Sequence, residues 1–169
     1  DYYKLAEPAE VAIEFRAQIE RALAAGLRPT HLDCHQGVYH WDERFFDIVK
    51  DLGGEYGLTM QVGYPPHRDR LRREGWVVID RLIWDSLSQP TTDLERFYQE
   101  NIRRLAPGVS ELLVFPAMAD DELRAIDPEL AAHREADLAC FTSETMKAFL
   151  RQEGIILIGY DALQRLPPG

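Results

Sequence analysis

The segment His31-Leu32-Asp33-Cys34-His35 holds the residue types that are best suited to chemistry in this chain. Alternate side chains of a β-strand project from the same face, so His31, Asp33 and His35 would lie together and Leu32 and Cys34 would face the other way. Two imidazoles and a carboxylate are typical ligands of zinc and similar divalent ions. The carboxylate could instead fix the tautomer of a neighbouring histidine. A hydrogen-bonded polar strand end without a ligand gives the same short pattern, so the spacing alone leaves both interpretations open.

Aromatic and polar residues in later segments are further candidates for a site. His40 has the opposite strand parity to the two preceding histidines, which indicates a structural role or a place in a pocket wall. Aromatic faces with polar neighbours suit carbohydrate rings, although aromatic residues in loops also serve as packing anchors. The residues of this kind are Tyr64, His67, Arg68 and Trp84.

Charged pairs and cysteines give weaker signals. Arg134 and Asp137 are three residues apart on an expected helix, which predicts an ordinary ion pair. Cys34 lies on the apolar face of its expected strand, which favours a buried packing residue over a nucleophile. The chain has only 2 cysteines, far apart in sequence, and they build no disulfide framework. This usage favours a reducing, cytoplasmic compartment.

Apolar periodicity predicts the elements that must position these residues. Val11, Phe15, Ile19 and Leu23 recur every four residues and form one helical stripe. Helices are expected over 9–25, 43–52, 92–105 and 144–152, with one or two short ones within 120–135. Strands are expected over 30–34, 58–62, 76–79, 111–115 and 155–158.

Two of these segments have special compositions. Residues 155–158 are apolar throughout, which is typical of a strand that is buried on both faces of a parallel sheet. Residues 64–67 contain two consecutive prolines, which lack amide donors, so no regular structure is expected there.

Strands and amphipathic helices alternate with short turns between them, which predicts an α/β fold with mostly parallel strands. A closed eight-stranded barrel normally takes about 250 residues, and this chain has 169. The sequence therefore predicts either an open sheet or an incomplete barrel. No long linker or internal repeat interrupts it, which favours one domain over residues 1–169.

Composition excludes several classes of function. The formal net charge is −10, and an acidic surface repels a phosphate backbone, so a dedicated nucleic-acid binder is not expected. No apolar run approaches the roughly 20 residues that span a bilayer, so no membrane-spanning protein is expected either.

Motifs along nearly the whole chain resemble the YdjC-like carbohydrate deacetylases, also called the ChbG/HpnK family. The run Pro29-Thr30-His31-Leu32-Asp33-Cys34-His35-Gln36-Gly37 resembles the family signature pTHlDsHxG. Three later segments resemble further family motifs in the same order: residues 105–112 (LAPGVSEL), 134–138 (READL) and 154–158 (GIILI).

The resemblance implies a distorted (β/α) barrel that binds one divalent metal, Mg or Zn, and removes N-acetyl groups from amino sugars. It makes His31 and His35 candidate metal ligands and Asp33 a catalytic or supporting carboxylate. It makes Arg134 and Asp137 pocket or supporting residues. Together with Tyr64 and Trp84, whose aromatic rings suit carbohydrates, they make up the predicted substrate pocket. The expected partner is an N-acetylated sugar, and a homo-oligomer is compatible with this interpretation.

The chain departs from the family pattern in two ways. Family members begin with an Asp-Asp strand and a later histidine motif, and neither occurs in this sequence, which therefore resembles the C-terminal portion of the family domain. Phe115-Pro116 stands where many members have His-Pro, and phenylalanine cannot donate a proton. Two alternatives remain: another metal-dependent hydrolase, or a catalytically silent sugar-binding or interaction domain on the same scaffold.

Overall fold

Helices and short strands alternate along the computed structural model, which describes residues 4–165 apart from the side chains of Gln36 and Trp41. Contacts divide these residues into two units. The first unit comprises residues 4–79 together with 158–165, and the second comprises residues 80–157. The described residues contain no helix that is long and apolar enough to cross a membrane.

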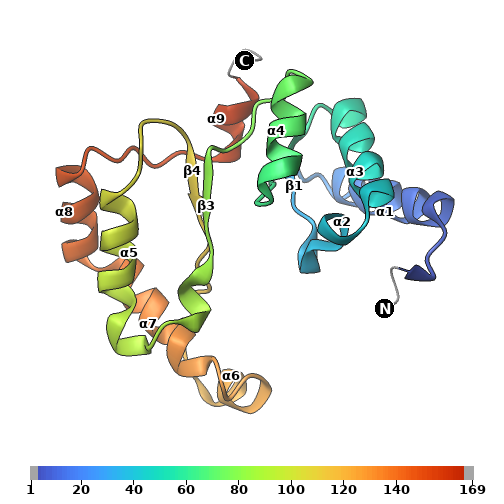
Figure 1. The fold of residues 1–169 in the computed structure, drawn as a ribbon. Coiled ribbons are helices and arrows are strands. Elements are labelled where there is room, and N and C mark those ends of the chain that lie inside the picture. Colours follow the sequence, from blue (N-terminus) through green and yellow to red (C-terminus); the bar gives the residue numbers. More distant parts are fainter. Residues whose placement is uncertain (1–3, 166–169) are drawn as a thin grey trace. The chain divides into compact units, whose positions relative to one another are not determined.

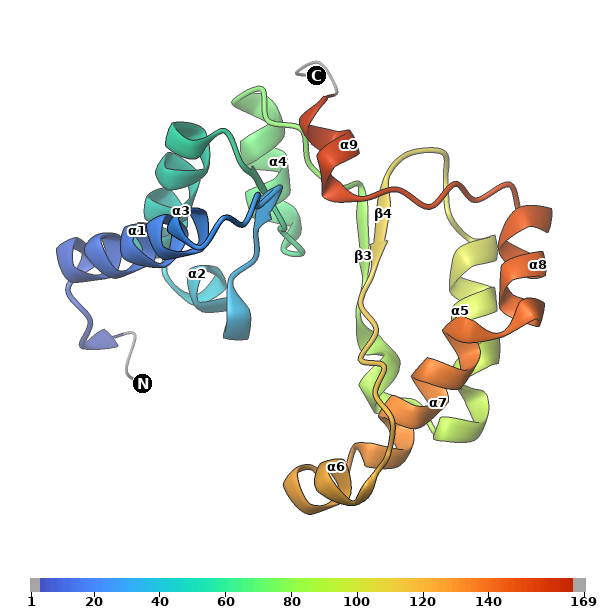
Figure 2. The same cartoon turned by 180° about the vertical axis from the view of Figure 1, so that it is seen from behind.

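The first unit is built around a pair of parallel strands, β1 (His31–Leu32) and β2 (Thr59–Met60). His31 pairs with Thr59, and Leu32 pairs with Met60. Helix α1 (Pro8–Ala24) packs against α3 (Glu43–Tyr56), and both views show these helices side by side (Figures 1 and 2). The other helices of this unit are α2 (Val38–Trp41), α4 (Pro65–Arg73) and α9 (Tyr160–Gln164).

Helix α3 shows how the sequence sets these boundaries. The Asp42 side chain accepts a hydrogen bond from the Arg44 amide at 2.9 Å, which caps the first turn. Gly57 ends the helix in the left-handed conformation, with φ of 66°, which glycine adopts without steric strain. The buried face contributes to the main core of the unit, which comprises Tyr39, Phe45, Phe46, Val49, Met60, Val62, Leu71 and Val78.

The second unit holds another parallel pair, β3 (Arg81–Ile83) and β4 (Ser110–Leu112). Helices α5 (Leu94–Arg103), α7 (Ala131–Thr142) and α8 (Glu144–Gln152) enclose its core, and a short α6 (Asp121–Ile126) precedes α7. In both views α5 and α8 lie on the same side of the strand pair (Figures 1 and 2). The buried core residues are Leu94, Tyr98, Ile102, Cys140, Met146 and Phe149.

Three sequence-based expectations are wrong. Residues 64–67 include the start of α4, because prolines fit the first turn of a helix, where amide donors have no intrahelical partner. Residues 76–79 form no strand, although Val78 and Ile79 are buried, and the strand begins at Arg81 instead. Residues 155–158 do not form the expected buried strand. No described strand pairs with them, and Ile156, Leu157 and Ile158 are 83%, 78% and 53% exposed.

The helices predicted over 9–25, 43–52, 92–105 and 144–152 are found within a few residues of their expected bounds. Helix α6 lies within 120–135, but α7 extends beyond it to Thr142, and α2, α4 and α9 were not predicted. The α/β class with parallel strands is confirmed. The described strands form two separate two-stranded sheets. The incomplete, distorted (β/α) barrel therefore stays a prediction.

Candidate functional site

The end of β1 carries the three residues that were singled out first. The strand stops at Leu32, and a 3-10 helix begins at His35, so the alternation of a strand does not extend across the whole segment. Asp33 and His35 are exposed, and His31 is half-buried. The expected arrangement on one continuous strand face is therefore not present. His31 is the first residue of β1, whereas Asp33 and His35 follow its carboxyl end, where α/β folds place their sites.

The His31 ring is held on two sides. Its Nδ1 atom lies 3.1 Å from the Thr30 hydroxyl, and its ring stacks on Tyr160 with centroids 3.9 Å apart. Burial lowers the pKa of His31, and the nearby negative charge of Asp33 partly opposes that shift. A neutral imidazole with a fixed ring is suited to bind a metal ion or to accept a hydrogen bond.

His40, Tyr64 and His67, which the sequence offered as separate candidates, form one cluster close to this segment, and their contact with Glu43 was not predicted. His67 is 3% exposed, and its Nε2 lies 2.8 Å from the Glu43 carboxylate. Its ring stacks on Phe46 at 4.0 Å between centroids, and the His40 and Tyr64 rings lie 5.9 Å and 5.0 Å from it. The pair of prolines was a local signal for the start of α4, and this helix start positions His67 in its first turn.

His40 links this cluster to the loop after β1. A Cβ atom added at Gly37 would lie 2.9 Å from His40 Cδ2, so the imidazole packs directly against this glycine. Burial and the neighbouring His67 lower the pKa of His40, and the charge of Asp33 acts in the opposite direction. His40 thus packs between Gly37 and His67, and its place in a pocket wall stays a prediction.

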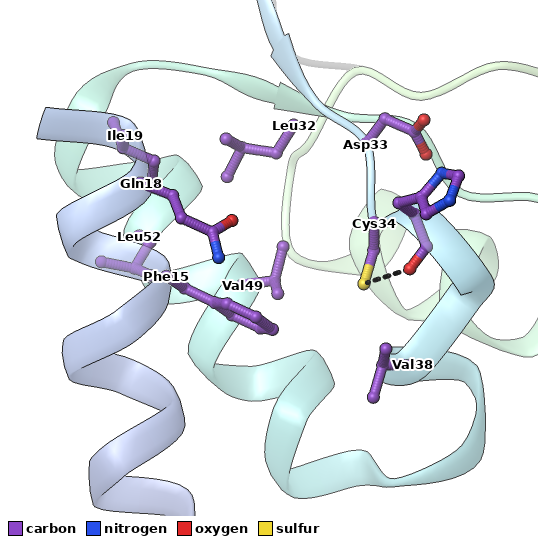
Figure 3. Close-up of a pocket in the computed structure, with 10 residues that line it drawn as sticks. Phe15, Gln18, Ile19, Leu32, Asp33, Cys34, Val38, Val49 and Leu52 are labelled. Carbon is purple, nitrogen blue, oxygen red and sulfur yellow. Dashed lines mark hydrogen bonds between the residues drawn. The ribbon is translucent and has the colours of Figure 1, made fainter. Parts of the chain in front are cut away.

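A crevice of about 280 Å³ opens beside β1 (Figure 3). Leu32 and Cys34 point into it, and Asp33, whose carboxylate points the other way, also contributes to its lining (Figure 3). Burial raises the pKa of the Cys34 thiol, which fits a packing residue better than a nucleophile. The remaining lining comes from α1, α3 and the turn after β1: Phe15, Gln18, Ile19, His35, Val38, Val49 and Leu52.

The other predicted pocket residues are divided between the two units. Tyr64 belongs to the first unit, where 47% of it is exposed beside His40 and His67. Trp84 belongs to the second unit, directly after β3, and is 63% exposed. Exposed aromatic rings of this kind can stack on sugars.

Arg134 and Asp137 do not form the expected ion pair. Arg134 instead binds Asp127 at 3.0 Å, and its guanidinium lies 5.8 Å from the centre of the Phe115 ring. Asp137 is fully buried and accepts hydrogen bonds from the Tyr98 hydroxyl at 2.5 Å and from the Phe115 amide at 2.9 Å. The two residues thereby hold the backbone that follows β4.

Metal ligation has only partial support from the described residues. Histidine and aspartate side chains provide suitable donor atoms at the end of β1. However, no group of three or more His, Cys, Asp or Glu residues in the described part of the chain is placed to hold a metal ion. These residues therefore do not form a complete metal site by themselves.

Comparisons with known proteins identify the relatives of the chain. A family model described as YdjC-like protein matches residues 2–152. A carbohydrate deacetylase of Thermoanaerobacter pseudethanolicus is 24% identical over 92% of this chain and 60% of its own length. A carbohydrate deacetylase of Brevibacillus brevis is 27% identical over 96% of this chain and 65% of its own length.

A solved structure supports the fold. It is described as a cellobiose-phosphate cleavage protein from Enterococcus faecalis, and it superposes with a TM-score of 0.75 at 21% identity. The match covers 94% of this chain and 62% of that one. The chain thus spans about 60% of the length of the proteins it matches. The family model covers most of the chain, so the protein belongs to the YdjC-like family.

Proposed function

We propose that the protein is a metal-dependent carbohydrate deacetylase, which removes N-acetyl groups from amino sugars or their oligosaccharides. The match of residues 2–152 to the YdjC-like family carries this proposal, together with the relatives that are named carbohydrate deacetylases. The position of His31 in β1 and of Asp33 and His35 directly after its carboxyl end supports it.

Residues in β1 and directly after it take the chemical roles in this proposal. A bound divalent ion, Mg or Zn, would supply an activated water and polarise the amide carbonyl. His31 and His35 are its proposed ligands in this chain, with the His31 ring oriented by Thr30 and Tyr160. The described residues do not complete the ligand set, so these two histidines would contribute only part of it. Asp33, exposed between them, is the proposed proton-accepting carboxylate.

The proposed substrate contacts use exposed aromatic rings. Tyr64 and Trp84 offer ring faces on which an N-acetylated sugar can stack. Within the second unit, Arg134 and Asp137 are the proposed supporting residues, because they hold the Phe115 segment after β4. We further propose a cytoplasmic protein in which residues 1–169 form the C-terminal portion of a single family domain with an incomplete, distorted barrel.

A silent sugar-binding domain is the second candidate. Phe115 favours it, since this side chain can neither donate a proton nor bind a metal ion. A binding domain would keep the aromatic surfaces of Tyr64 and Trp84 and would need no complete metal site.

Acetate release separates the two candidates. The protein is freed of metal with a chelator, reloaded with Zn²⁺ or Mg²⁺, and incubated with N,N′-diacetylchitobiose and longer chitooligosaccharides. We expect metal-dependent acetate release that falls about 100-fold or more in a His31→Asn/His35→Asn double variant. A His133→Asn variant is the control, because His133 is a buried histidine of the other unit. Bound metal without acetate from any N-acetyl sugar contradicts the proposal, and sugar binding without acetate favours the second candidate.

A further inference from the structure

Ring contacts hold His40 in place, and no described residue forms a hydrogen bond with its side chain. The centre of its imidazole lies 4.4 Å from that of the Tyr39 ring and 5.9 Å from that of the His67 ring. Neither of its ring nitrogens has a hydrogen-bond partner in the described part of the chain. The Nδ1 atom is buried, whereas Nε2 is not. Nε2 is therefore the polar atom of this side chain that a ligand can reach.

The Nε2 edge of His40 faces the turn that carries the proposed reactive groups. A Cβ atom added at Gly37 would lie 2.9 Å from His40 Cδ2 and 3.8 Å from its Nε2. Gly37 ends the 3-10 helix that begins at His35, two residues after Asp33. Because glycine has no side chain, Gly37 leaves this edge of the imidazole uncovered. A group that binds to Nε2 thus lies beside the turn after β1.

Tyr64 is the exposed aromatic neighbour of His40. The two ring centres are 6.2 Å apart with the planes at 73°, and 47% of Tyr64 is exposed. A ring face with a polar group at its edge suits a sugar, because the C–H groups of the sugar can stack while its oxygen atoms accept hydrogen bonds. A sugar that stacks on Tyr64 is therefore within reach of His40 Nε2.

The burial of Nδ1 decides which ring nitrogen of His40 carries the proton. A neutral imidazole has one N–H donor and one acceptor nitrogen. Buried N–H groups without an acceptor are rarer in proteins than under-satisfied acceptors, so the unpartnered Nδ1 favours the tautomer with the proton on Nε2. Burial also lowers the pKa of His40, which keeps the ring neutral. His40 thus offers a single uncharged N–H donor.

We propose that His40 determines specificity by donating a hydrogen bond from Nε2 to the acetamido carbonyl oxygen of an N-acetyl sugar that stacks on Tyr64. This inference rests on the proposed function, because it uses the same sugar platform and the same substrate class. The acetamido group is the part of the sugar that must lie at Asp33 for the proposed reaction, and the Nε2 edge faces that turn. Sugar hydroxyl groups are the alternative acceptors, and they are present with or without the acetyl group.

Two disaccharides with the same linkage isolate the acetamido contact. N,N′-diacetylchitobiose has an acetamido group at the second carbon of each ring, where cellobiose has a hydroxyl group. The full chain is titrated with each sugar in the presence of a chelator, so that the acetyl group is not removed, and binding is followed by NMR. We expect the wild type to prefer N,N′-diacetylchitobiose. We also expect the imidazole nitrogen shifts of free His40 to show the proton on Nε2.

Two substitutions at His40 separate the hydrogen bond from packing. His40→Phe keeps a ring in the cluster but removes the donor, so the preference for N,N′-diacetylchitobiose over cellobiose should fall about three- to tenfold. His40→Gln restores an N–H donor near the same position and should retain most of this preference. A loss of stacking on Tyr64 would weaken both sugars alike and leave the preference unchanged.

His133→Phe is the matched control. His133 is a buried histidine of the other unit that likewise has an unpartnered ring nitrogen. The same substitution there removes a nitrogen from a packed ring without touching the cluster of His40. We expect this variant to keep the wild-type preference between the two sugars.

Four results would overturn this role of His40. These are an unchanged preference in His40→Phe, an equal fall in His133→Phe, a proton on Nδ1, and no binding of N,N′-diacetylchitobiose by the wild type. Acetate release by the metal-loaded wild type together with an unchanged preference in His40→Phe would contradict this inference and leave the deacetylase proposal standing. A preference that falls in His40→Phe and returns in His40→Gln, without acetate release by the wild type, would support this inference and contradict that proposal.

Discussion

Asp137 provides the sharpest stability prediction, because its carboxylate joins three elements of the second unit. It lies on α7, accepts the Tyr98 hydroxyl of α5, and accepts the Phe115 amide just after β4. Both burial and this hydrogen bond raise the pKa of Tyr98, so its hydroxyl keeps its proton and remains a donor. Asp137→Ala would leave two donors without an acceptor.

The expected magnitude follows from counting those donors. A buried donor without a partner costs about 1–3 kcal/mol, so Asp137→Ala should lower the free energy of unfolding by about 2–6 kcal/mol. Asp137→Asn retains one acceptor oxygen and should lose about half as much. Asp127→Ala is the control, because it breaks a partly exposed ion pair with Arg134, and such pairs contribute about 1 kcal/mol or less.

Urea titration combined with hydrogen exchange and mass spectrometry measures these losses. Because the chain divides into two units, hydrogen exchange is followed on peptides from α5 and α7, which belong to the second unit. The amide of Phe115 should lose its protection in Asp137→Ala. A loss below about 1 kcal/mol, or an equal loss in Asp127→Ala, would refute the assignment of Asp137 as the central acceptor of this unit.

The remaining predictions concern single positions. Gly37→Ala should lower the thermal midpoint more than Gly57→Ala: both glycines have positive φ, of 63° and 66°, but only the new Cβ at position 37 would contact His40. Equal midpoints would contradict this packing. The lowered pKa of His40, caused by burial and His67, means that the unfolded chain binds this proton more readily. The contribution of neutral His40 to the free energy of unfolding is thus fully present above the ordinary histidine pKa, and it is lost as the pH falls through the pKa of His40 in the folded protein. An NMR titration of His40 with a midpoint at or above the ordinary histidine pKa would contradict this expectation. Ser143→Ala should lower the free energy of unfolding by about 1 kcal/mol, because the Ser143 hydroxyl caps the first turn of α8. An unchanged free energy of unfolding in a urea titration would contradict this role of the cap.

Local signals predicted the helices well. Ser143 and Gly154 mark the ends of α8, and this helix was predicted to the residue because capping and apolar spacing are local properties. The strands were harder to predict, because a ladder needs a partner. Residues 155–158 have the composition of a buried strand, but no described strand pairs with them.

The candidate site was predictable only in its residue types. The two histidines and the aspartate were evident from their spacing, but the end of β1 at Leu32 and the 3-10 helix that begins at His35 were not. The contact between His67 and Glu43 joins residues 24 positions apart, and no local pattern reports such a pair. Spacing along a helix likewise suggested an ion pair of Arg134 with Asp137, whereas the observed partner, Asp127, precedes that helix.

Acetate release by an Asp33→Asn variant tests the proposed function most directly. Asp51→Asn is the matched control, because Asp51 lies on α3 with its side chain 78% exposed. With the metal-loaded protein and an N-acetylated chitooligosaccharide, we expect Asp33→Asn to lower kcat by about 100-fold or more with little change in KM. Asp51→Asn should retain the wild-type rate. Wild-type acetate release by Asp33→Asn would contradict the role of the β1 end as the active site of a carbohydrate deacetylase.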